Sequence, residues 1–406
     1  MRIEALSGWT PAQRHVVLAS YLGWTLDAFD FFLMTFVFSD IEKEFDAPAW
    51  FVAFTITLTL GMRPLGALLI GRAADRWGRR PVLMFDVLLY SIIDFASGFS
   101  PNLTTLLVLR ALFGVAMGGE WGVGASLTME TIPPKARGLV SGLLQSGYPS
   151  GFLLASIVYG QVYSRLDPDI AWRVMFMIGA APALLVLYIR RSVPESPGWE
   201  KSTEKRSGIG EILRKHWKMA LYAVLLMTAF NFFSHGTQDG FPNKFLKGQL
   251  GLQPGDISRT MIIFNIGAIC GGLSFGSISE RLGRRWTIIT AALLSILAVL
   301  FVTSTTDLVT ITIGAFLLQF MVQGAWGVIP VHLNELSPDG VRGTFPGFVY
   351  QLGNFIASVN LNLQVWIATL YGGQFSTAIL MVGGAAAVSI AVLTFLGTER
   401  KGVVLA

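Results

Sequence analysis

The amino-acid sequence predicts an all-α membrane protein whose twelve transmembrane helices form two pseudo-symmetric bundles of six. The chain of 406 residues is 53% hydrophobic and only 14% charged, with a mean hydropathy of +0.59. A soluble domain of this length cannot bury so much apolar surface, so the chain belongs in a bilayer. Apolar runs of about 20 residues, the length needed to cross a bilayer, recur twelve times, and a charged loop motif occurs twice.

The apolar runs divide evenly between the two halves of the chain. In the first half they lie near residues 16–38, 50–71, 82–99, 103–128, 138–162 and 172–190. In the second half they lie near residues 219–246, 257–279, 286–304, 308–333, 343–368 and 374–397. The residues before the first run include Glu4, Thr10 and Gln13 and lack the apolar core of a signal peptide. We therefore expect the first run to remain in the protein as a helix.

The positive charges predict how these helices are oriented. The loop after the second run carries four arginines, Arg72, Arg76, Arg79 and Arg80. The next connection, residues 100–104, carries no positive charge. Because basic loops stay in the cytoplasm, an even number of helices places both termini there, with the helices in the plasma (inner) membrane. The net charge of +5 then reflects topology, and we expect no nucleic-acid partner.

An internal repeat divides the molecule. The stretch that begins at Gly71 recurs at Gly276, 205 residues later. Two further matches share this separation, namely Trp121 with Trp326 and Glu130 with Glu335. The repeat predicts an N-terminal bundle over residues 14–191, a cytoplasmic linker over 192–218 and a C-terminal bundle over 219–400. Repeats in parallel orientation place the substrate near the membrane midplane, between the two bundles.

The repeated loops pair carboxylates with arginines, and we expect them to gate the transport pathway. Asp75 and Glu280 can accept hydrogen bonds from arginines and from helix N-termini. Such bonds would hold the cytoplasmic ends of the bundles together in one state and release them in another. The alternative is that the charges only retain the loops in the cytoplasm. The expected gating residues are Gly71, Asp75, Arg76, Gly78, Arg79, Glu130, Arg137, Glu280, Arg281, Gly283, Arg284, Glu335 and Arg342.

Ionisable residues inside the first-half runs are candidates for proton coupling, because charge at membrane depth is costly and marks a pathway. Asp27 and Asp30 share one face of the first run. Arg110, on the fourth run with Glu120, is expected to pair with Asp27 or Asp30. Such a pair is either a permanent buried ion pair that holds the helices together, or it contains a carboxylate that binds and releases a proton during the transport cycle. Asp86 and Asp94 on the third run could lie near a helix end or pair with a loop, and they are only secondary candidates for the site.

Arg63 lies within the second run and has no obligatory partner in its own helix. A guanidinium keeps its charge and presents a fork that matches a carboxylate. We expect it to bind a substrate carboxylate, with pairing to Asp27, Asp30 or Glu120 as the alternative.

Polar residues interrupt the seventh run, which otherwise is apolar from 221 to 246. His235 stands 205 residues after Asp30, so a carboxylate in one half corresponds to an imidazole in the other, and this pairing indicates proton handling. On the eleventh run, Gln351 and Asn354 share a face. The expected substrate-binding residues are Arg63, Asn231, His235, Gln238, Gln351 and Asn354. The expected proton-coupling residues are Asp27, Asp30, Arg110, Glu120, His235 and Asp239.

These motifs resemble those of one transporter superfamily. The loop from Gly71 to Arg80 resembles the loop between helices two and three of the major facilitator superfamily, and Arg110 with the glycines that follow it resembles the helix-four motif of proton-coupled members. The seventh run resembles the helix-seven signature of the fungal lactate permease group, within the sialate and lactate proton-symporter family. The matching residues are Asn231, Ser234, His235, Thr237, Gln238 and Asp239. One position departs from that signature, because Asn243 stands where the family usually has threonine.

The resemblance implies monocarboxylate recognition and proton coupling by the seventh helix, helped by an arginine on helix two and polar residues on helix eleven. We therefore expect a monomeric proton-coupled symporter of a lactate- or pyruvate-like acid that works by alternating access. The residues from Asp27 to Asp30 also resemble the helix-one motif of aromatic-acid proton symporters, so sialic or aromatic acids are alternative substrates. A sugar-type facilitative uniporter and a non-transporting receptor are further alternatives. No enzyme motif, metal site or cofactor is expected.

Overall fold

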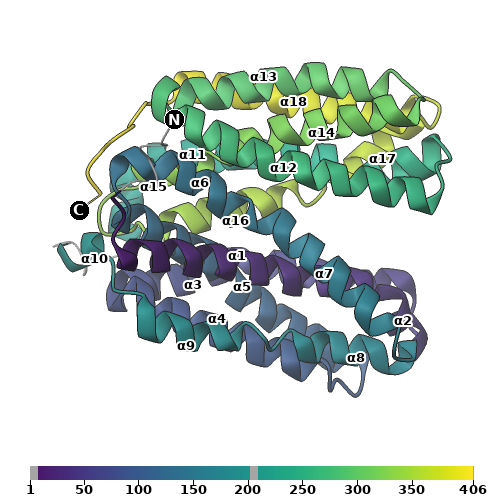
Figure 1. Cartoon of the computed structure of the whole chain (residues 1–406), viewed down its shortest axis with the longest axis horizontal. Helices are drawn as coiled ribbons and strands as arrows, with labels where there is room; N and C mark the ends of the chain where they lie inside the picture. The colour runs from purple at the N-terminus through teal and green to yellow at the C-terminus, as the bar shows by residue number, and fades with distance from the viewer. Residues whose placement is uncertain (1–7, 202–208, 406) are drawn as a thin grey trace.

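A computed structural model describes residues 8–201 and 209–405, and every regular element in those ranges is a helix. The helices form two bundles that lie side by side, one from each half of the chain (Figure 1). Helix α6 from the first half packs against α12 of the second, and this contact forms part of the interface between the bundles. The expected fold class, two six-helix bundles, is confirmed.

The first half contains six spans. Their helices are α1 (Pro11–Phe36), α3 (Ala49–Trp77), α4 (Arg79–Ser97), α5 (Leu103–Thr131), α6 with α7 (Arg137–Gln145 and Gly147–Tyr163), and α8 with α9 (Pro168–Ile178 and Ala183–Ser192). The short elements are α2 (Phe38–Glu44), η2 (Pro134–Ala136) and α10 (Pro197–Lys201). Two of these spans are interrupted, between α6 and α7 and between α8 and α9. Pro149 lies in the first turn of α7, and Pro182 directly precedes α9. A proline there removes the N–H that would continue the helix.

The second half repeats this plan. Its helices are α11 (Ile209–Gln238), the π-helix η3 (Phe241–Gln249), α12 (Pro254–Leu282), α13 (Arg284–Thr303), α14 (Leu308–Trp326), α15 (Ile329–Leu336), α16 (Phe345–Ala357), α17 (Asn360–Leu370) and α18 (Phe375–Leu396). Pro242 and Pro330 stand in the first turns of η3 and α15. Runs expected as single helices are therefore broken, as in transporters whose interrupted helices line a cavity.

Within the described ranges, nine helices are long and apolar enough to cross a membrane. The other three expected spans correspond to α4, to α6 with α7, and to α16 with α17. Helix α4 falls short because it carries four charged residues, Arg79, Arg80, Asp86 and Asp94, and the other two are interrupted. Part of the expected linker, residues 202–208, lies outside the described residues.

The repeated motif forms the same turn twice. Gly78 ends α3 at φ 112° and Gly283 ends α12 at φ 89°, in the region that favours glycine. A carboxylate caps each following helix: Glu195 accepts from the backbone N–H groups of Arg79 and Arg80, and Glu399 accepts from that of Arg285. Burial raises the pKa of Glu195, while these backbone donors act to lower it.

The two bundles touch at the end of the molecule that holds α10 and these two turns, which we call the linker end (left in Figure 1). Gly71 packs against Thr344, and Gly142 packs against Gly272. A Cβ added at Gly71 would lie 2.7 Å from the Thr344 backbone, and one at Gly142 would lie 2.1 Å from the Gly272 carbonyl oxygen. Glycine permits this approach of backbones, so the structure is closed at the linker end.

Candidate substrate cavity and gate

A cavity of about 200 Å³ lies between the bundles, on the side away from the linker end. Four aromatic rings and five polar side chains dominate its lining. The rings are Phe32, Tyr148, Phe152 and Phe264, and the polar residues are Gln238, Asp239, Asn265, Gln319 and Gln323. Interface cavities with an apolar lining and few polar groups are typical of small-molecule sites.

His235 connects the end of α11 to α16 beside this cavity. Its Nδ1 lies 3.1 Å from the Asp239 carboxylate, and its Nε2 lies 2.9 Å from Oδ1 of Asn354. The structure thus brings together three predicted site residues, one on α11, one just after its end and one on α16. Asp239 itself lines the cavity.

The other predicted binding residues separate into two groups. Gln238 lines the cavity and donates to Oε1 of Gln319 at 3.1 Å. Asn231 is buried, and its amide donates to the backbone carbonyls of Met227 (2.7 Å) and Tyr350 (3.5 Å). It therefore joins α11 to α16 and does not line the cavity. Gln351 is also buried and away from the cavity lining.

Arg63 forms no ion pair with any carboxylate in the part of the chain that the structure describes, so the alternative pairing with Asp27, Asp30 or Glu120 is not seen. Its guanidinium lies 4.9 Å from the centre of the Phe31 ring and contacts the sulfur of Met117. The Phe31 and Phe32 rings are 5.4 Å apart, and Phe32 lines the cavity. Arg63 is thus separated from the cavity by aromatic side chains in this conformation.

Arg110 does not pair with Asp27 or Asp30, and that expectation is wrong. Its Nη2 lies 2.6 Å from Oδ1 of Asp94 and 2.6 Å from the Ser97 hydroxyl. The reason is that α4 and α5 are antiparallel neighbours joined by the short connection 98–102, which brings Asp94 opposite Arg110.

Three predicted coupling carboxylates therefore remain without a charged partner. Asp27 and Asp30 on α1 and Glu120 on α5 are almost fully buried, and no hydrogen-bond donor faces their oxygens among the residues described. Glu120 lies against the backbone of α1, because a Cβ added at Gly23 would lie 2.4 Å from its Oε1. Asp86, a secondary candidate from the sequence, is buried in the same way.

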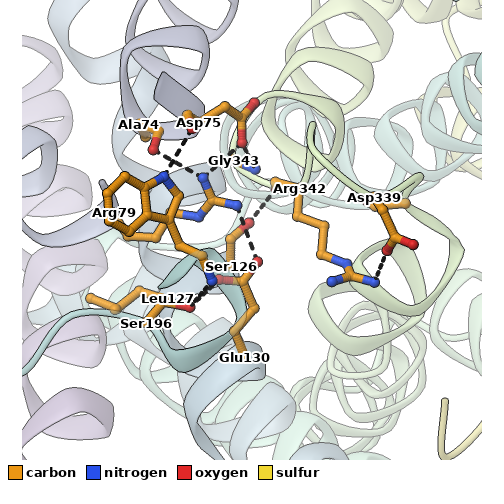
Figure 2. Close-up of polar contacts among 12 residues, drawn as sticks. Ala74, Asp75, Arg79, Ser126, Leu127, Glu130, Ser196, Asp339, Arg342 and Gly343 are labelled. Atoms are coloured by element: carbon orange, nitrogen blue, oxygen red, sulfur yellow. Dashed lines mark hydrogen bonds and ion pairs between the residues drawn. The ribbon is translucent and has the colours of Figure 1, made fainter. Parts of the chain in front are cut away.

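The first repeated loop holds the two halves together at the linker end (Figure 2). Asp75 accepts from the backbone N–H groups of Gly343 (2.8 Å) and Thr344 (3.1 Å) and from the Thr344 hydroxyl. Arg79 bridges Asp75 at 2.7 Å and Glu130 at 3.1 Å. Asp75 thereby bonds across the bundle interface.

The second loop makes the corresponding contact in the opposite direction. Glu280 accepts from the backbone N–H of Gly138 in the first half. Arg284 bridges Glu280 at 2.9 Å and Glu335 at 3.1 Å. Asp75 and Glu280 with their arginines therefore form two symmetric latches.

The remaining gate candidates are less uniform. Arg137 donates to the carbonyls of Met129 (2.9 Å) and Val403 (2.7 Å). Arg342 pairs with Asp339, and its carbonyl accepts from the Ser126 hydroxyl (Figure 2). Arg76 and Arg281 are exposed, and the Arg76 guanidinium lies over Trp77.

The sequence prediction did not include the amides Asn265, Gln319 and Gln323. Each is a polar residue within an apolar run, and the pair at 319 and 323 is separated by one helical turn. That spacing is the signal that indicates a shared face.

Comparison with known proteins shows which family the chain resembles. The profile of the Major Facilitator Superfamily matches residues 20–241, and that of the Sugar (and other) transporter family matches 222–396. A probable 4-methylmuconolactone transporter of Cupriavidus pinatubonensis is 30% identical, over 86% of this chain and 82% of the relative. The sialic acid transporter NanX of Escherichia coli is 27% identical, over 92% and 91% of the two chains.

A solved structure of the proton:xylose symporter XylE, bound to 6-bromo-6-deoxy-D-glucose, has a TM-score of 0.80 at 19% identity and covers 96% of this chain and 97% of that chain. This likeness shows a shared fold. The relatives are transporters rather than enzymes, and the resemblance inferred from the sequence motifs is confirmed. The chain belongs to the major facilitator superfamily and is a multi-pass integral membrane transporter.

Proposed function

We propose that this protein is a proton-coupled symporter of a small monocarboxylate, which it carries by alternating access between the two bundles. The observation that carries this proposal is the position of His235. Both of its ring nitrogens face oxygen acceptors, on Asp239 and Asn354. With the Asn354 amide oriented as it is in this structure, each ring nitrogen can donate, which is the arrangement of an imidazolium. A cation beside the cavity attracts an organic anion, and loss of its proton removes the attraction.

The buried carboxyl groups of the first half support coupling. An ionised carboxylate without a donor is costly in a buried position. Asp27, Asp30 and Glu120 are therefore positioned to hold a proton in this conformation and to release it when the helices rearrange. Arg110, bonded to Asp94, would act on them as a neighbouring charge. Proton and anion then favour the same conformation, and this differential affinity couples their movement.

The latches indicate which side of the membrane is closed in this conformation. The basic loops lie at the linker end, so we propose that this end is cytoplasmic, together with both termini, in the inner membrane. The conformation is then closed to the cytoplasm. Opening requires Asp75 and Glu280 to leave their partners. We retain the proposed boundaries of 14–191 and 219–400 for the two bundles and 192–218 for the linker, and we propose a monomer in the bilayer.

Acids larger than lactate are the second candidate. Four rings line the cavity, and one relative is described as a sialic acid transporter. Neutral sugars are a poorer match, because the site presents a histidine cation with Arg63 behind the rings.

Uptake into proteoliposomes tests the proposal. Purified protein is reconstituted, and radiolabelled lactate, pyruvate and benzoate are supplied with an acidic outside or at equal pH. We expect accumulation above the external concentration only with the gradient, and its loss on addition of a protonophore. Uptake that merely equilibrates in both conditions would identify a facilitative uniporter.

A further inference from the structure

Two glutamines of α14 line the cavity, and each carries a buried hydrogen-bonding atom that has no partner among the described residues. Gln319 and Gln323 are one helical turn apart and both line the cavity, with 1% and 6% of their surface exposed. Nε2 of Gln319 and Oε1 of Gln323 have no hydrogen-bond partner among the described residues. Buried amide groups are normally paired, so this donor and this acceptor point to a ligand group that bonds to both.

Gln238 fixes the orientation of the Gln319 amide. It donates from Nε2 to Oε1 of Gln319 at 3.1 Å. The Gln319 oxygen is thereby occupied, and its NH₂ group is left as the donor. The pair thus offers one donor and one acceptor, which suits a hydroxyl, a carboxamide or a lactam on the ligand.

Aromatic side chains form the opposite wall. The Phe32 and Phe152 rings are in edge-to-face contact at 4.9 Å, and the Phe32 and Tyr148 rings are 5.2 Å apart. These rings fix one another's positions and present an apolar surface for a flat body. Lactate has only one methyl group to place against them.

We propose that Gln319 and Gln323 are specificity-determining residues that read a second hydrogen-bonding group on a ring-bearing carboxylic acid. The acid would place its carboxylate near His235 and its ring against Phe32, Tyr148 and Phe152. Its second group would meet α14. This inference rests on the proposed function, and it favours the second candidate, an acid larger than lactate, carried in the same cavity.

Equilibrium binding to the purified full-length protein tests the assignment. The probes are lactate, benzoate and 4-hydroxybenzoate, titrated by calorimetry into the wild type and into the Gln319→Leu and Gln323→Leu variants. The wild type should bind 4-hydroxybenzoate at least about tenfold more tightly than benzoate, because a site built to bond a hydroxyl discriminates against its absence. Each variant should retain benzoate binding and lose that difference.

Gln145→Leu is the matched control. Gln145 is a buried glutamine on α6 whose Oε1 also lacks a partner among the residues described, but it does not line the cavity. This variant should keep the preference for the hydroxylated acid.

The two proposals fail in different ways. Equal binding of benzoate and 4-hydroxybenzoate to the wild type, or a preference that survives in both α14 variants, would overturn the role of the glutamines while leaving acid transport intact. Absence of binding by all three acids, together with absence of gradient-driven uptake, would overturn the proposed function itself.

Discussion

His235 on α11 and Asn354 on α16 are joined by a hydrogen bond of 2.9 Å between Nε2 and Oδ1. The bond places the imidazole at the cavity with Asp239 on its other side. Asn354→Leu removes the acceptor and leaves a ring N–H unpaired, which costs roughly 1–3 kcal/mol. We expect about tenfold weaker substrate binding. Asn354→Gln keeps a neutral amide acceptor and should bind closer to the wild type than Asn354→Leu; equal loss in both variants would show that the bond to His235 is not the cause.

Arg63→Lys tests the proposed carboxylate anchor. The substitution preserves the positive charge but removes the planar fork that bonds a carboxylate at two points. Because Arg63 forms no ion pair with the described carboxylates, we propose that it meets the anion in a conformation in which the Phe31 and Phe32 rings no longer separate it from the cavity. The expected result is an affinity lower by about tenfold in a binding assay. Unchanged affinity would exclude Arg63 as the anchor.

Asp75→Asn tests the latch. The carboxylate accepts from two backbone N–H groups and one hydroxyl of the opposite half. Replacing one oxygen by an NH₂ group sets a donor against donors, and a hydrogen bond to a charged group contributes about 1.5–3 kcal/mol. We expect the population closed at the linker end to fall by about a factor of ten or more, as reported by spin-label distances across that end. Glu280→Gln should act similarly, and substrate binding should stay measurable in both.

The latch assignment depends on where the effect appears. If Asp75→Asn abolished equilibrium binding and left the distance distribution unaltered, the residue would belong to the binding site rather than to the gate.

The buried pair of Arg110 and Asp94 predicts a stability pattern. Removing one partner leaves an uncompensated buried charge, at a cost of about 3–5 kcal/mol. Asp94→Leu alone should therefore lower the thermal unfolding temperature in detergent. The double variant Asp94→Leu with Arg110→Leu should recover much of the loss. Asp30→Asn should have little effect on stability, and a loss equal to that of Asp94→Leu would indicate that Arg110 depends on Asp30 instead.

The sequence predicts the repeat better than it predicts the partners. The spacing of glycines and carboxylates after α3 and α12 predicts the repeated turn, because the conformation of a turn depends on residues close in sequence. Gly78 and Gly283 both adopt a positive φ. The partner of Arg110 could not be predicted in the same way, because it depends on tertiary packing. Helix α4 packs on α5, and this contact places Asp94 beside Arg110 in place of the aspartates of α1. Gln319 and Gln323 were missed since an amide within an apolar run does not reveal which face meets a cavity.

Uptake by the Asp239→Asn variant beside the wild type tests whether transport is coupled to protons. The amide keeps the size of the carboxylate and can still accept from His235, but it cannot titrate and lacks the negative charge that stabilises an imidazolium. Vesicles are loaded for counterflow exchange at equal pH or are given an imposed pH gradient. We expect that Asp239→Asn, Asp30→Asn or both lose accumulation driven by the gradient while counterflow survives. Gradient-driven accumulation at the wild-type level in both variants and in His235→Ala would contradict proton coupling through these residues.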